Sequence, residues 1–245
     1  DFRKWFGNNE YVINWENSGA EIINYCLANG KQASRPQNLQ YNYKQNISYS
    51  SLTSGKPSYR SYNDFLNDQA GNYFIVNQLG YYYILLGFLN SKVSYYFKSI
   101  KNNTLNITAD DLITIPFLFC NIEKIGKRVC ESITISKTDW DSHETSWDFQ
   151  QNELIRLSRE DFSSTSTEQK FHEHETKVPW AWNKNFMGME QLFHVYEQYW
   201  TSQFLQLHHN EEELNRQFIE IYGLQDELTP DVPLDEITIL QQGEI

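Results

Sequence analysis

Hydrophobic and polar positions follow two different rhythms along the chain, and the rhythm changes near residue 80. Before that point, short apolar and aromatic runs that alternate with polar residues predict strands at 11–15, 41–43, 47–49 and 74–76. Asn-Asn, Ser-Gly and Asn-Gly pairs lie between these runs and predict turns. The first third of the chain is therefore predicted to be mostly β.

From residue 82 onward the apolar positions step by three and four. This spacing predicts one helix from about Tyr82 to Ile100, followed by an extended segment that leads to Pro116. Asn121 is a suitable N-cap for a second helix, whose apolar stripe runs over 122–133. A polar connector with four tryptophans is then expected over 139–185.

Two further helices are predicted near the end of the chain. The first spans about five turns from Met189 to Leu207, and the second begins at a capping pair, Asn210 and Glu213, and ends at Gly223. The pattern as a whole predicts an α+β protein: a mixed α/β domain over residues 1–120, followed by a mostly helical domain over residues 121–245.

Composition indicates a folded chain in a reducing compartment. Of 245 residues, 40% are hydrophobic and 16% are aromatic, and no apolar run has the length of a membrane span. The three cysteines have no CxxC spacing, which argues against a disulfide framework and against a zinc site. A cytoplasmic location follows as the default. The chain starts without Met or a signal peptide, and we expect it to be a fragment of a longer protein.

Charge is distributed unevenly. Residues 1–120 carry ten Lys and Arg against eight Asp and Glu, a net of +2, whereas residues 121–245 carry ten against 24, a net of −14. From Ile22 to Asn63 there is no acidic residue, although five basic residues, six tyrosines and many Gln, Asn and Ser lie there. Such a segment suits a surface that meets a polyanion and hydrogen-bonds base edges. An ordinary polar, β-rich surface has the same composition.

No catalytic signature is present. The sequence lacks GxGxxG, GxxxxGK[ST], GxSxG and HExxH. His172 and His174 offer two metal ligands without a third, so a solvated loop is favoured. Asp110 and Asp111 fit the first turn of a helix better than a catalytic carboxylate pair. Cys26 and Cys130 lie on apolar-patterned segments and are expected to be small core residues.

Several strings resemble the C-terminal part of PglX-type enzymes, the adenine-specific DNA methyltransferases of BREX phage-defence systems, which are related to type IIG restriction-modification enzymes. The first of them begins Trp5-Phe6-Gly7-Asn8-Asn9. Together they occupy residues 5–17, 34–38, 49–55, 85–92, 139–142, 144–149, 210–215 and 221–228.

The resemblance implies a division of labour within a bacterial protein. In such enzymes an upstream domain binds S-adenosylmethionine and carries an Asn-Pro-Pro-Tyr motif for the flipped adenine, while the following region recognises the DNA target. This chain has neither Asn-Pro-Pro-Tyr nor a glycine-rich cofactor loop. We therefore expect no catalysis and no cofactor here, with S-adenosylmethionine bound elsewhere in the parent enzyme. The expected partners are double-stranded DNA, the upstream methyltransferase domain and other defence-system proteins, with no membrane.

Residues 1–120 are expected to form the target-recognition domain, and residues 121–245 a helical spacer and C-terminal domain. Within the acid-free segment, Arg, Gln and Asn suit base contacts, and Ser, Thr and Lys suit phosphate contacts. The predicted base-reading residues are Arg35, Gln37, Asn38, Gln40, Lys56 and Arg60, and the predicted phosphate contacts are Lys44, Ser50, Ser51, Thr53 and Ser54.

A second reading is a protein-interaction module whose acidic helical half docks onto partner proteins or mimics the charge of DNA, with the β half as scaffold. A third reading, a self-sufficient enzyme such as a nuclease, needs clustered carboxylates, which the sequence does not offer. The placement of the basic residues discriminates between the first two readings. Convergence of Arg35, Lys44, Lys56 and Arg60 on one concave face favours DNA recognition, whereas scattered bases beside an acidic ridge favour the interaction module.

Overall fold

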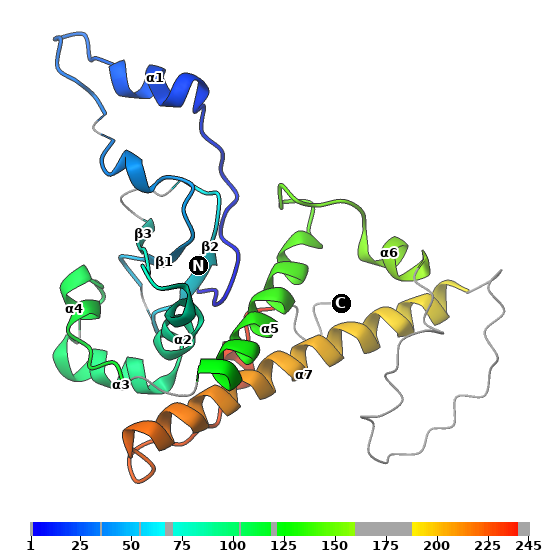
Figure 1. Cartoon of the computed structure of the whole chain (residues 1–245). Coiled ribbons are helices and arrows are strands. Elements are labelled where there is room, and N and C mark those ends of the chain that lie inside the picture. Colours follow the sequence, from blue (N-terminus) through cyan, green and yellow to red (C-terminus); the bar gives the residue numbers. More distant parts are fainter. Residues whose placement is uncertain are drawn as a thin grey trace, which may run out of the picture.

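A computed structural model describes residues 2–34, 36–53, 55–66, 71–102, 104–118, 122–159 and 188–239. As predicted, the fold is α+β, with a small antiparallel sheet beside a larger set of helices (Figure 1). The described elements are α1 (Glu16–Asn24), η1 (Leu39–Tyr41), β1 (Asn46–Ser50), β2 (Tyr59–Tyr62), β3 (Gly71–Phe74), α2 (Leu79–Leu89), α3 (Lys92–Lys101), α4 (Ala109–Ile113), α5 (Ile122–Asp141), α6 (Glu153–Arg159), α7 (Met189–Tyr222) and η4 (Leu234–Glu236).

The sheet has the order β2-β1-β3, and both pairings are antiparallel. The N-terminal segment extends it, because Trp5 bridges Arg60 in parallel and exchanges backbone hydrogen bonds with Tyr59 and Ser61. β2 is therefore covered on its outer side as well. This covering explains why three of the four β2 residues are buried.

Two predicted strands are absent from the described residues. Residues 11–14 are exposed, and without a neighbouring strand their loose alternation does not form a ladder. Around 41–43 the backbone forms the 3-10 turn η1 and a left-handed residue, Tyr43 at φ 61°. The predicted strand at 47–49 is confirmed within β1, and the one at 74–76 overlaps β3 only at Phe74.

The single helix predicted over 82–100 is two helices, α2 and α3, that break at Asn90 and Ser91. The Asn90 side chain accepts a hydrogen bond from the Tyr59 amide at 3.0 Å and donates one to the Tyr59 carbonyl at 2.9 Å. Ser91 then caps α3, since its Oγ accepts from the Ser94 amide. The tie to β2 outweighs the continuous apolar stripe, and the prediction of one helix is wrong.

α7 is one helix of 34 residues, so the predicted stop near residue 207 is wrong. Asn210 is no cap: it is fully buried, its Oδ1 accepts from Arg128 Nη1 at 3.2 Å, and its Nδ2 donates to Glu131 at 3.0 Å. Gly223 ends the helix as predicted, at φ 64°, a left-handed conformation that favours glycine.

The core runs through both halves of the chain. Gly87 of α2 lies against α5 and α7, where an added Cβ would meet Val129 at 2.7 Å. Nearby, the Phe88 ring packs edge-on against Phe218 and stacks on Tyr222 of α7. One cluster of buried residues therefore contains α2, α5 and α7 side chains together. The division at residue 120 stays a prediction.

The N-terminal segment also binds the helical half through buried polar contacts. Lys4 Nζ lies 2.5 Å from Glu211 of α7, and Trp5 Nε1 donates to the other carboxylate oxygen at 2.7 Å. Arg3 pairs with Asp139 of α5 at 2.7 Å. Each of these carboxylates is at most 4% exposed, so the contacts fix the N-terminal segment between sheet and helices.

Both described cysteines are free thiols. Cys26 is exposed, which corrects its expected core position, and Cys130 is half-buried.

Across the described ranges, the structure contains no helix that combines the length and the apolar character needed to cross a membrane.

Candidate nucleic-acid interface

Residues 10–45 form a long excursion from the sheet, here called the projecting loop, which carries α1 and η1 away from the helical half (Figure 1). Of its described residues only Gly19 is buried. Gly19 is required there, because it has φ 78° and a Cβ would meet the Trp15 ring at 2.7 Å. Most of the acid-free segment, up to residue 45, thus belongs to an exposed element.

Four of the predicted DNA-contacting residues lie on the projecting loop with exposed side chains: Gln37, Asn38, Gln40 and Lys44. Asn38 adopts a left-handed conformation, φ 58° and ψ 32°, directly before η1. Lys44 Nζ lies 5.4 Å from the centre of the Tyr41 ring, a weak cation–π contact that leaves the amine in solvent. The structure brings these four side chains into one short stretch of exposed surface.

Three more predicted residues lie where β1 leaves the sheet. Ser50, Ser51 and Thr53 are half-buried. Their backbone pairs with the segment after α3: the Ile107 amide donates to the Ser51 carbonyl at 2.8 Å, and the Thr53 amide donates to the Leu105 carbonyl at 3.1 Å. Arg35 and Ser54 lie outside the described residues.

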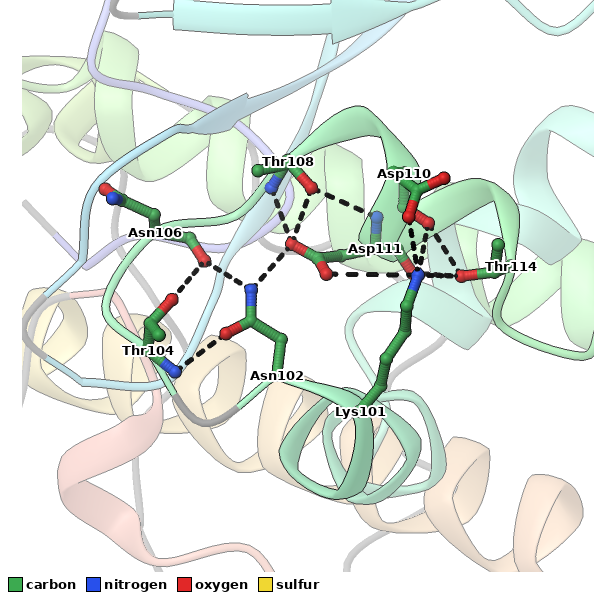
Figure 2. A network of polar contacts seen from close by, with 8 residues as sticks. All are labelled: Lys101, Asn102, Thr104, Asn106, Thr108, Asp110, Asp111 and Thr114. Atoms are coloured by element: carbon green, nitrogen blue, oxygen red, sulfur yellow. Dashed lines mark hydrogen bonds and ion pairs between the residues drawn. The ribbon is translucent and has the colours of Figure 1, made fainter.

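A polar network around Asp111 holds the segment between α3 and α4 in place (Figure 2). Thr108 caps α4, and Asp111 reciprocates by accepting from the Thr108 amide and hydroxyl, each at 2.8 Å. Asn102 donates to the same carboxylate at 2.9 Å. Lys101 Nζ contacts Thr114 Oγ1 and, at 2.7 Å, the Asp110 carbonyl. Asp110 and Asp111 are therefore first-turn residues of a helix, as predicted.

The pKa of Asp111 reflects that network. Burial alone would raise it, but the hydrogen bonds from Thr108 and Asn102 and the charge of Lys101 bring it below the ordinary value of 3.8. An ionised, fully hydrogen-bonded carboxylate is suited to holding a backbone in place. It is not suited to accepting a proton near neutral pH.

Arg60 is buried, with 3% of its surface exposed. Its Nη1 donates to the Arg3 carbonyl at 3.2 Å and to Ser58 Oγ at 3.3 Å, and its Nη2 donates to Ser50 Oγ at 3.2 Å. Burial raises the pKa of Tyr62, and the Arg60 guanidinium beside it partly offsets that rise. The pairing of Trp5 with β2 encloses Arg60, so its guanidinium is out of reach of a DNA groove in this structure.

Lys56 lies at a surface pocket and forms an ion pair with Glu236 at 2.5 Å. The pocket combines residues of the β1–β2 connection with the C-terminal turn η4. It is lined by Phe2, Ser50, Leu52, Thr53, Gly55, Lys56, Ser58, Asp235 and Glu236. The sequence carries no local signal for this meeting, because about 180 residues separate the partners.

The described basic residues of the acid-free segment do not converge on one face. Lys31 and Lys44 lie on the projecting loop, Lys56 lies at the pocket and Arg60 lies in the interior. Arrangement of charge alone therefore does not favour a DNA-binding surface over an interaction surface. What the projecting loop offers is exposed amide and hydroxyl groups, and its acidic residues, Glu10, Glu16 and Glu21, all precede residue 22.

The projecting loop also exposes apolar side chains, which the sequence pattern does not predict. Tyr11 is 91% exposed, Val12 66% and Ile13 52%, and Tyr25 and Leu27 are exposed as well. The sequence pattern predicts a strand at residues 11–15, and a strand in a sheet would bury alternate side chains. Among the described residues no strand pairs with them, so these side chains stay exposed.

The part of the chain that the structure describes contains no group of three or more His, Cys, Asp and Glu placed to hold a metal ion. His172 and His174, the weak metal candidates from the sequence, lie outside the described residues.

Comparison with known proteins gives two relatives and no matching family model. Over 240 residues, 97% of the chain, it is 31% identical to the adenine-specific methyltransferase PglX of Lacticaseibacillus casei (strain Zhang), of which it covers 18%. Over 159 residues, 63% of the chain, it is 37% identical to the adenine-specific methyltransferase BrxX of Escherichia coli O9:H4 (strain HS), of which it covers 12%. The chain thus spans less than a fifth of the length of either relative.

Proposed function

This chain is related to a part of the adenine-specific methyltransferases PglX and BrxX, and from that premise we propose that it recognises the DNA target of such an enzyme. Methyl transfer then takes place in a part of the protein outside this chain, where S-adenosylmethionine is bound. The chain itself supplies no catalytic residue, and its partners are duplex DNA, the catalytic domain and other defence-system proteins of the bacterial cytoplasm.

One observation carries the proposal: the exposed amides of Gln37, Asn38 and Gln40 lie in the part of the projecting loop, residues 22–45, that has no acidic residue. Gln and Asn side chains can donate to and accept from the same adenine edge, which gives each good pair about 1–3 kcal/mol of discrimination. A phosphate backbone repels carboxylates, and residues 22–45 of the loop carry none. The projecting loop therefore extends from the fold and carries side chains that can hydrogen-bond base edges.

Within the interface, the amide side chains and the lysine have different roles. Gln37, Asn38 and Gln40 contact base edges, whereas Lys44 contacts the phosphate backbone and sets the orientation. Since the whole chain has a net charge of −12, affinity is expected to be modest and strongly dependent on salt. Target choice then depends on the projecting loop within the larger enzyme, whose other domains add affinity.

The first test is binding of this chain to duplex DNA across a salt series. We expect the logarithm of the binding constant to fall linearly with the logarithm of salt concentration, with a slope of about −0.9 for each phosphate contacted. A chain that shows no binding at low salt, in the presence of duplexes of mixed sequence, contradicts the proposal.

The second test concerns specificity. Substitution of Gln37, Asn38 and Gln40 by Ala in the full-length enzyme is expected to relax the methylated motif in a sequencing assay, at a cost of about 1–3 kcal/mol per lost base contact. Gln225→Ala, at an exposed position after α7, is the matched control and should leave the motif unchanged. An identical motif in the triple variant would remove these residues from the reading set.

A protein-interaction module is the alternative, and the exposure of Tyr11, Val12 and Ile13 favours it. Contiguous exposed apolar residues mark surfaces that bind other proteins. Under this alternative, Val12→Asp abolishes assembly with the rest of the enzyme and leaves the methylated motif unchanged. Under DNA recognition, the amide variants change the motif and leave assembly intact.

A further inference from the structure

Arg60 carries a buried charge that no carboxylate of the described residues neutralises. In the described part of the chain no Asp or Glu oxygen lies within 4 Å of its guanidinium, and its Nε has no hydrogen-bond partner. The oxygens that face it are neutral: the Arg3 carbonyl, the Ser50 and Ser58 hydroxyls, and the Tyr62 hydroxyl. An uncompensated charge in the interior is costly, so its retention indicates that an anion completes the site.

Ser50 and Ser58 connect that charge to the surface. Both hydroxyls accept a hydrogen bond from Arg60, and both residues line the surface pocket. A serine hydroxyl has one hydrogen to donate besides its acceptor lone pairs. With their lone pairs facing the guanidinium, these two hydroxyls are poised to donate into the pocket, as an anion requires.

Lys56 supplies a second positive charge at the rim of the same pocket. Its amine is paired with Glu236 at 2.5 Å, and both side chains keep some exposure, 37% for Lys56 and 21% for Glu236. Ion pairs of this kind contribute little to stability and exchange readily for another anion. Both pocket carboxylates, Asp235 and Glu236, come from the short turn η4. A shift of η4 would thus remove both negative charges at once.

We propose that this pocket binds a phosphate group of the DNA backbone, and that the Glu236 carboxylate takes the place of the phosphate when DNA is absent. Ser50 and Ser58 donate to the phosphate oxygens, Lys56 pairs with them, and the buried Arg60 provides the field behind them. This proposal rests on the proposed DNA recognition and adds a defined phosphate position and an internal competitor for it.

Replacing the Glu236 carboxylate by an amide of the same size tests whether it competes with phosphate. Glu236→Gln keeps the size of the side chain, frees Lys56, and is expected to raise the affinity for duplex DNA about three- to tenfold at low salt. Glu220→Gln, at an exposed position of α7, removes the same charge far from the pocket and should change affinity less than twofold. Equal gains in the two variants would show a general charge effect and overturn the proposal.

Two further variants examine the pocket itself. Adding Lys56→Gln to Glu236→Gln should cancel the gain and make the salt slope about one unit shallower, because one phosphate contact is lost. Ser58→Ala should weaken binding about three- to tenfold. Circular dichroism checks that each variant is folded. A double variant that keeps the full gain would exclude Lys56 from the contact.

A DNA-free readout separates this proposal from the proposed function. Titration of the Glu236→Gln chain with inorganic phosphate, followed by amide NMR shifts, should move the signals of Gly55 and Ser58, and Lys56→Gln should suppress that movement. Phosphate shifts without DNA binding would support the pocket and reject DNA recognition. DNA binding without phosphate shifts, and without a Glu236→Gln gain, would reject the pocket and leave DNA recognition standing.

Discussion

At the scale of residues, the structure distinguishes polar side chains that hold the fold from those that face solvent. Asp111 anchors a helix cap, as predicted, whereas Arg60, a predicted base-reading residue, is enclosed behind Trp5. Gln37 and Gln40 have equally polar side chains and stay exposed. Residue type alone could not separate Arg60 from these exposed residues, because its partner Arg3 lies 57 residues away in the chain.

The Asp111 cap predicts a dependence of stability on pH. Since the folded-state pKa of Asp111 is lowered, its contribution is fully present above the ordinary value of 3.8 and is lost as the pH falls through the lower folded-state value. Asp111→Asn should therefore lower the free energy of unfolding by about 1 kcal/mol at pH 7. The deficit should shrink below pH 4, as measured by urea unfolding at several pH values.

Asp110→Asn is the control for that experiment, because this carboxylate is 76% exposed and pairs with the same Lys101. A change of less than about 0.5 kcal/mol is expected for it. If the Asp111→Asn deficit were constant from pH 7 to pH 3, the cap would not depend on the charge of the carboxylate.

At the scale of elements, periodicity predicted the helices better than it predicted their ends. The stripe of α5 and the Gly223 end of α7 were recovered. The break between α2 and α3 was missed, because Asn90 bonds to a strand some 30 residues earlier. The continuity of α7 was missed as well, since Asn210 has the composition of a cap but is held by α5. Local signals fail where a tertiary partner satisfies the same polar group.

Gly87 gives a prediction at this scale. Gly87→Ala places a methyl group 2.7 Å from Val129 and should force α2 and α5 apart, which lowers the free energy of unfolding by about 1–3 kcal/mol. Gly126→Ala is a suitable control, because it lies on α5 with open space around the added Cβ. Thermal unfolding measures both, and a stabilised Gly87→Ala would contradict the close approach of the helices.

At the scale of the whole molecule, the predicted α+β class is confirmed, and the separation of the chain into a +2 half and a −14 half acquires a structural meaning. Some of the acidic residues of the second half are internal: Asp139 and Glu211 neutralise Arg3 and Lys4 of the first half. The sequence-level charge difference therefore overstates the difference between the two surfaces. No sequence pattern could show this, because the pairing spans more than 130 residues.

The contact between the halves predicts a shared loss of stability. Glu211→Gln leaves Lys4 buried without its counter-charge and should lower the free energy of unfolding by about 3 kcal/mol. Glu220→Gln on the exposed side of α7 should cost less than about 0.5 kcal/mol. Helical circular dichroism and tryptophan fluorescence should report the same shifted urea midpoint. Two separate midpoints would mean that sheet and helices unfold independently.

The Lys4–Glu211 contact also has an evolutionary consequence. A lineage that replaces either residue alone passes through a destabilised intermediate, whereas replacing both by apolar residues of similar volume is nearly neutral. The Trp5 indole N–H donates to the same Glu211 carboxylate. A replacement of Glu211 therefore also removes the hydrogen-bond partner of position 5. Among relatives of this chain, the identities at positions 4, 5 and 211 should therefore covary, although they lie at opposite ends of the sequence.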